Sequence, residues 1–111
     1  MIKNQTKKFT IIGKTKVLRS IFTQGTGLMF RKKPDYGLIF AFRKERTIGI
    51  TMFCVFYPID ILFLDKDKRV VDIKKGLKPF TDYYPKVKAM YVIELLPGLL
   101  KKTDLGDKIE F

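Results

Sequence analysis

Three charged residues lie inside or beside apolar segments, and they are the first candidates for chemistry. Asp60 and Glu94 each stand between two aliphatic residues, and Arg31 ends the segment 27–31. A carboxylate in such a place either faces solvent or is buried with a partner, because an unpaired buried charge is very costly. One interpretation is therefore a pocket in which Arg31 holds an anionic ligand while the two carboxylates orient it.

Two other interpretations fit the same three residues. Asp60 and Glu94 could be the acid–base pair of a small enzyme acting on a sugar-like or anionic substrate, as two carboxyl groups do in glycoside hydrolysis. Alternatively, a bridge between Arg31 and a carboxylate could lock the segment 27–31 against a sheet. The sequence offers no second catalytic element, so we favour the structural bridge over the ligand pocket and over catalysis.

The composition excludes several catalytic and metal-binding classes. The chain has 111 residues, with Cys54 as its only cysteine and no histidine. A Ser-His-Asp triad, a Cys-His nucleophile and a Cys/His zinc site therefore cannot be assembled from it. Asp60, Asp65 and Asp67 lack the oxygen spacing of a calcium loop and have basic neighbours, so we expect no metal and no cofactor.

The chain length predicts the domain organisation, and the absence of sorting signals in the sequence predicts the cellular location. A chain of this size is expected to form one domain over residues 1–111. It has a single cysteine, no signal peptide and no apolar run of about 20 residues, which together predict a soluble, cytoplasmic protein without membrane association. The sequence leaves open whether the protein is a monomer or a dimer.

The net charge of +12 is concentrated near the N-terminus. The first 34 residues contain nine lysines and arginines and no acidic residue. A one-sided basic segment can bind nucleic acid or another polyanion, and the candidate residues are Lys14, Lys16, Lys32 and Lys33. No nucleic-acid-binding motif accompanies these charges, so a role in solubility is the preferred explanation.

A second basic region lies in the segment 77–88. It combines aromatic and basic side chains: Phe80, Tyr83, Tyr84, Lys78, Lys86 and Lys88. Aromatic rings that are exposed can stack on bases or sugars. We nevertheless expect an ordered loop that packs these rings onto the core.

The hydrophobic pattern predicts a mainly β fold that positions these residues. Apolar or alternating runs typical of strands occupy residues 8–12, 15–18, 37–42, 47–56, 59–64, 69–73, 89–96 and 108–111. Pro58 separates two of the runs, and residues 65–68 have the polar character of a hairpin tip. We expect about six to eight strands in a small barrel or sandwich, with one or two short helices, one of them at 99–103 and another possible within 20–30.

Several of these segments together resemble one family. The blocks are GLMFR at 27–31, GLIF at 37–40, PIDILFLD at 58–65, RVV at 69–71, VIEL at 92–95 and LGDKI at 105–109. Their order and spacing are similar to those of the prokaryotic domain-of-unknown-function family 192, over about residues 15–111. The resemblance implies a compact β-rich fold without an established activity. Many relatives carry a tryptophan and polar residues before the Pro-x-Asp block, where this chain has TMFCVFY at 51–57, so a ligand role for those polar residues cannot be transferred.

Overall fold

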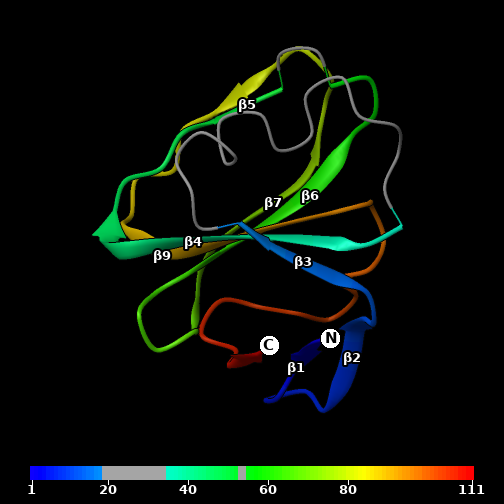
Figure 1. Cartoon of the computed structure of the whole chain (residues 1–111), viewed down its shortest axis with the longest axis vertical. Helices are drawn as coiled ribbons and strands as arrows, with labels where there is room; N and C mark the ends of the chain where they lie inside the picture. The colour runs from blue at the N-terminus through cyan, green and yellow to red at the C-terminus, as the bar shows by residue number, and fades with distance from the viewer. Residues whose placement is uncertain (19–34, 53–54) are drawn as a thin grey trace.

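The computed structural model describes residues 1–18, 35–52 and 55–111, which form ten strands in three sheets (Figure 1). The central sheet has five strands in the order β3-β4-β9-β6-β7. Strand β3 runs parallel to β4, and the other neighbours are antiparallel. These strands are β3 (Thr15–Leu18), β4 (Gly37–Arg46), β9 (Ala89–Leu95), β6 (Ile59–Leu64) and β7 (Val70–Leu77).

Two smaller sheets lie on opposite sides of the central sheet. One has three strands in the order β10-β1-β2 and joins the two ends of the chain: β10 (Ile109–Glu110), β1 (Ile2–Asn4) and β2 (Phe9–Ile12). The other is a ribbon of β5 (Ile50–Thr51) and β8 (Asp82–Tyr83). In the view of Figure 1 the ribbon lies above the central sheet, and β1, β2 and both termini lie below it.

The central sheet buries side chains on both faces because successive residues of a strand point in opposite directions. On its N-terminal face Ile39, Leu62, Leu64, Ile93 and Leu95 form one buried cluster with Ile2, Ile11, Leu100 and Ile109. On its ribbon face Leu38, Phe40, Ile61, Phe63 and Val92 form a second cluster with Ile48, Ile50, Met52, Val55 and Tyr57. Two covered faces explain why strands such as β6 are apolar at almost every position.

The predicted strands of the second half of the chain are confirmed. Strand β6 has the predicted bounds of 59–64, and β7, β9 and β10 fall on the runs beginning near residues 69, 89 and 108. The polar tip at 65–69 is a hairpin in which the Asp65 amide donates to the Arg69 carbonyl at 2.9 Å. Lys68 takes the left-handed conformation there, with φ of 62°.

The predicted mainly β fold is confirmed, but the barrel, one of the two predicted architectures, is not. Within the described residues, β3 and β7 are the two edges of the central sheet and do not pair with each other. A barrel requires hydrogen bonding to close the sheet on itself, and here the smaller sheets cover the faces instead. The strand number is also higher than expected, because the sequence pattern missed β1 and did not resolve the short pairings of the ribbon.

The predicted helices are not confirmed. Residues 99–103 form turns, in which the Thr103 amide donates to the Leu100 carbonyl at 2.9 Å, and Lys101 with φ of 49° cannot continue a right-handed helix. The other predicted helix, within residues 20–30, lies outside the described residues. Among the described residues of the run 47–56, only Ile50–Thr51 form a strand, β5, and the Val55 amide donates to the Met52 carbonyl at 3.0 Å.

Candidate functional site

The register of the central sheet places the two candidate carboxylates on opposite faces. Asp60 in β6 is opposite Leu95, whose side chain belongs to the cluster of the N-terminal face. Glu94 in β9 is opposite Ile61 and Leu38, whose side chains belong to the cluster of the ribbon face. Residues opposite each other in paired strands point to the same face. Asp60 and Glu94 therefore cannot flank one substrate as an acid–base pair.

Asp60 is a buried carboxylate held by backbone amides. Its side chain is 4% exposed, and it accepts hydrogen bonds from the Gly76 amide at 2.8 Å and the Gly98 amide at 3.2 Å. Both glycines have positive φ, 63° and 95°, a conformation that glycine adopts without steric cost. Asp60 thus joins the end of β7 to the turn after β9, a structural role at this position.

Glu94 lies in a more apolar place. It is 8% exposed, and within the described residues no group donates a hydrogen bond to its carboxyl group. Burial raises the pKa of Glu94 to about 8. The group is therefore mainly protonated and uncharged at neutral pH, which lowers the cost of keeping it among Leu38, Ile61 and Val92.

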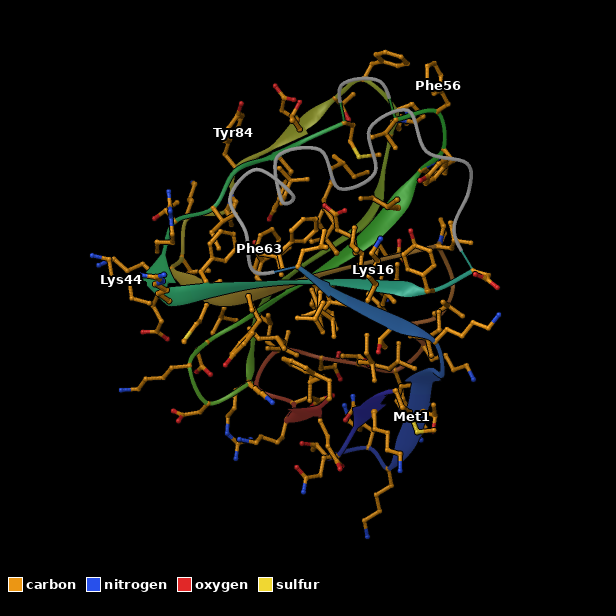
Figure 2. All side chains as sticks on the ribbon, in the orientation of Figure 1. Met1, Lys16, Lys44, Phe56, Phe63 and Tyr84 are labelled. Carbon is orange, nitrogen blue, oxygen red and sulfur yellow. The ribbon has the colours of Figure 1, made fainter. Side chains whose placement is uncertain are left out.

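The third member of the predicted pocket, Arg31, lies outside the described residues, as do Lys32 and Lys33. Lys14 and Lys16 are both exposed, and Figure 2 labels Lys16 on β3. The Lys14 ammonium forms an ion pair of 2.8 Å with Asp35, and this hydrogen bond raises the pKa of Lys14. The ion pair offsets one of the charges in the predicted N-terminal basic segment.

Two of the three aromatic residues of the segment 77–88 are more exposed than we expected, while Tyr83 packs against the core as predicted. Phe80 is 56% and Tyr84 is 70% exposed, so these rings do not pack onto the core. Tyr83 is half-buried and donates to Asp72 at 2.5 Å; this hydrogen bond raises the pKa of Tyr83 to about 12. A further ring, missed by the sequence reasoning, is Phe56, which is 63% exposed and meets Phe80 edge to face with ring centroids 5.3 Å apart.

The backbone of the ribbon holds the Phe80 ring in this exposed position. The Phe80 amide donates to the Met52 carbonyl at 3.0 Å, and the Met52 amide donates to the Thr81 carbonyl at 2.9 Å. Phe80 has φ of 61°, a left-handed conformation that is rare and unfavourable for an aromatic residue. We use the name aromatic ribbon surface for six exposed residues on or next to the ribbon: Phe56, Phe80, Tyr84, Lys78, Lys86 and Lys88.

The part of the chain that the structure describes has neither a cluster of metal-binding side chains nor a membrane-spanning helix. No group of three or more histidine, cysteine, aspartate or glutamate side chains there could hold a metal ion. No helix among the same residues has the length and apolar character needed to cross a membrane.

The fold defines a class of small β proteins in which a five-stranded mixed sheet is covered on both faces by short strands. Two solved structures share it. One is a candidate transcription regulator from Sinorhizobium meliloti, with a TM-score of 0.79 and 26% identity over 86% of this chain and 79% of that protein. The other is a protein of unknown function from Novosphingobium aromaticivorans, with a TM-score of 0.79 and 28% identity over 87% of this chain and 74% of that protein.

The chain belongs to the DUF192 family, described as "Uncharacterized ACR", whose model matches residues 2–111. The resemblance found in the sequence is thereby confirmed and extends to the N-terminal strands. A UPF0127 protein from Pyrococcus horikoshii is 39% identical over 100% of this chain and 98% of its own length. A UPF0127 protein from Pyrococcus abyssi is 36% identical over 100% of this chain and 97% of its own length.

Proposed function

We propose that this protein is a non-enzymatic binding module that binds single-stranded nucleic acid through the aromatic ribbon surface. The observation that carries the proposal is the exposure of Phe56, Phe80 and Tyr84 at 63%, 56% and 70%, together with three exposed lysines in the segment that contains Phe80 and Tyr84. Large apolar rings are costly to leave in water, and exposed rings near basic side chains are typical of surfaces on which bases stack.

The charge of this surface suits a polyanion. Between residues 78 and 88 the chain has three lysines and one acid, Asp82, and all four side chains are exposed. In β8, Asp82 is exposed and Tyr83 is half-buried, and Phe80 and Tyr84 on either side of this strand are both exposed. In Figure 2 Phe56 and Tyr84 both lie in the upper part of the molecule, on opposite sides of the view. The S. meliloti structure is described as a candidate transcription regulator, which is compatible with contact with nucleic acid.

The two alternatives have less support. Catalysis by Asp60 and Glu94 would need both carboxylates in one cleft, and their side chains point to opposite faces of the central sheet. Binding through the N-terminal basic segment would need Lys14 and Lys16 to face the ligand, and Lys14 already pairs with Asp35. The ribbon offers rings as well as charge, so we favour it over both.

The test is the affinity for a fluorescein-labelled single-stranded oligonucleotide, measured by anisotropy over a series of salt concentrations. We expect Phe80→Ser to weaken binding about tenfold, since stacking on one ring contributes about 1–3 kcal/mol. The double variant Lys86→Ala/Lys88→Ala should lower the slope of log Kd against log salt by about 1.4.

The matched control is Lys14→Ala/Lys16→Ala, which removes the same charge elsewhere on the surface. Equal losses from the two double variants would show that only net charge matters, and a larger loss from Lys14→Ala/Lys16→Ala would support the N-terminal segment instead. If the wild-type protein does not bind the oligonucleotide even at low salt, the proposed function is wrong.

A further inference from the structure

We propose that the ribbon selects guanine bases: the Tyr84 ring stacks on the base, and the Asp82 carboxylate beside it accepts hydrogen bonds from the edge of the base. This inference rests on the proposed function and names the part of a single strand that the aromatic ribbon surface recognises. Two contacts of Tyr84 carry it, one with Gly49 and one with Asp82.

The Tyr84 ring is held at one edge, and its faces are open. A methyl group added at Gly49 would lie 2.8 Å from both Cδ1 and Cε1 of Tyr84 but 4.0 Å from Cγ, so the backbone at Gly49 supports the ring edge that these two atoms form. Tyr84 is 70% exposed (Figure 2), and among the described residues it takes part in no ring–ring or cation–π contact. An aromatic face in solvent is a platform on which a base can stack.

Asp82 lies at the hydroxyl end of this platform. The Tyr84 hydroxyl donates to Asp82 Oδ2 at 3.3 Å, and the negative charge of Asp82 raises the pKa of Tyr84, so the hydroxyl stays protonated. Asp82 is exposed and forms no ion pair with any residue that the structure describes. A carboxylate has about four acceptor positions on its two oxygens, so the bond from Tyr84 leaves most of them open to a ligand.

A carboxylate beside a stacked base favours guanine over the other bases, because it can only accept hydrogen bonds. The pairing edge of guanine has two adjacent donors, the ring N–H and the amino group, which match the two carboxylate oxygens. Adenine and cytosine have one amino donor next to a ring nitrogen that accepts, and thymine and uracil have one N–H between two carbonyl oxygens. Those acceptors repel a carboxylate, so Asp82 attracts guanine and disfavours the other bases.

The charges of the ribbon divide into two roles. Asp82 is the single acid among residues 78–88, where three exposed lysines suit a phosphate backbone. An acid here weakens the general attraction for a polyanion, whereas a hydrogen bond to the edge of a base reads the sequence. The lysines therefore contribute affinity for any strand, and Asp82 contributes the choice of base.

The experiment measures, by anisotropy, the affinity of the full chain for labelled ten-nucleotide thymidine strands in which one central base is guanine, adenine, cytosine or thymine. We expect the guanine strand to bind about tenfold more tightly than the thymine strand. Asp82→Asn should reduce this ratio to about two and leave the affinity for the thymine strand equal or higher, because the strand then meets one negative charge less.

Two variants of Tyr84 test the platform. Tyr84→Ser removes the ring and should weaken the binding of the guanine and thymine strands alike by about tenfold. Tyr84→Phe keeps the ring and removes only the hydroxyl, so the affinity for the thymine strand should be unchanged. A Tyr84→Ser variant that binds as tightly as the wild-type protein would overturn the role of the ring.

The matched control is Asp67→Asn, which removes an exposed carboxylate in the turn between β6 and β7 and should leave the guanine preference unchanged. Equal wild-type affinities for the four strands, a preference that survives in Asp82→Asn, or one that is lost equally in Asp67→Asn would each overturn the inference. If the strands still bind and Phe80→Ser still weakens binding, the proposed function stands without it. If no strand binds at low salt, the proposed function fails and this inference fails with it.

Discussion

Asp60 and Glu94 are buried on opposite faces of the central sheet, and the two carboxyl groups differ in the hydrogen bonds that they receive. On the N-terminal face Asp60 receives two backbone hydrogen bonds, and Asp107 at the covering layer receives three, from the Asn4 amide group, the Lys7 ammonium and the Asp104 backbone amide. On the ribbon face, Glu94 receives none within the described residues and is surrounded by aliphatic side chains.

The layers that cover the two faces of the central sheet also differ, in how many polar contacts they make and in how much apolar surface they leave exposed. The N-terminal face is closed by strands from both ends of the chain, and Asn4 also bonds the buried Thr103 hydroxyl at 3.0 Å. The ribbon face is covered by a two-stranded ribbon that leaves Phe56, Phe80 and Tyr84 exposed. The N-terminal side thus has hydrogen-bonded buried polar groups, whereas the ribbon side combines a buried Glu94 that receives no hydrogen bond from the described residues with three exposed rings.

The largest expected effect is the loss of the polar network on the N-terminal side. Asp107→Ala removes one of the two acceptors of the buried Asn4 amide group and the acceptor of the Asp104 backbone amide, so we expect a loss of about 4 kcal/mol in the free energy of unfolding. Urea denaturation would measure it. The matched control is Asp104→Ala, which removes the exposed partner of the same lysine and should cost less than about 1 kcal/mol. Similar losses in both variants would show that the network is unimportant.

The second prediction is that the buried carboxyl groups on the two sides of the central sheet give the stability of the protein opposite pH dependences. Burial raises the pKa of Asp107, but hydrogen bonds from Asn4, the Asp104 amide and Lys7 outweigh burial, so the pKa is lower than its ordinary value. The ionised Asp107 therefore stabilises the folded protein, and this stabilisation is lost as the pH falls below about 4. Glu94 acts in the opposite direction. Its folded pKa of about 8 lies above the unfolded value of 4.5, so its contribution is present in acid and is lost as pH rises from 4.5 through 8.

We therefore expect Glu94 to lower the stability of the wild-type protein by roughly 3 kcal/mol between pH 5 and pH 8. Glu94→Gln should remove most of this dependence while it preserves the size of the side chain. Denaturation midpoints across the pH range would measure both proteins. An unchanged pH profile in Glu94→Gln would mean that the carboxyl group is ionised and paired in the folded protein.

The smallest expected effects are the stability losses caused by a methyl group added at Gly37, which contacts the N-terminal covering, and at Gly49, which contacts the ribbon side. A methyl group at Gly37 would lie 2.8 Å from Ile2 Cδ1 and 3.0 Å from both Ile12 and Leu95, so Gly37→Ala should cost about 1–3 kcal/mol. A methyl group at Gly49 would lie 2.8 Å from the ring of Tyr84, which is 70% exposed and can move aside. Gly49→Ala should therefore cost less than about 0.5 kcal/mol. Thermal midpoints would rank the two variants, and a reversed order would contradict the contrast between the faces.

The sequence predicted the strands whose pattern is local and missed the elements that depend on distant partners. Residues 59–64 were predicted with the right bounds, because Pro58 and the polar tip at 65–68 delimit a run in which every residue except Asp60 is apolar. Strand β1 is short, and its partners β2 and β10 include the far end of the chain, so Ile2–Asn4 gave no recognisable local signal. The turn at 99–103 looked like a helix because the left-handed backbone at Lys101 cannot be seen from a lysine in the sequence.

The candidate site was predicted only in part. The sequence correctly singled out Asp60 and Glu94 as polar residues in apolar strands, and the structure finds both buried. The sequence could not predict that Asp60 and Glu94 lie on opposite faces of the sheet, because each has the same local pattern of one carboxylate between two aliphatic residues. The exposed Phe56 was missed as well, since the exposure of a ring depends on which segments cover it.

Composition and local pattern by themselves determined that the chain forms strands, that its charge is strongly basic, and that histidine- and disulfide-based chemistry is absent. Only the tertiary structure decided which face of the central sheet each carboxyl group occupies and which rings stay in water. The physical reason is the register of the strands. The pairing of Ile61 with Glu94 rather than with a neighbouring residue sets the face for every side chain of β9, and a shift of one residue would reverse it.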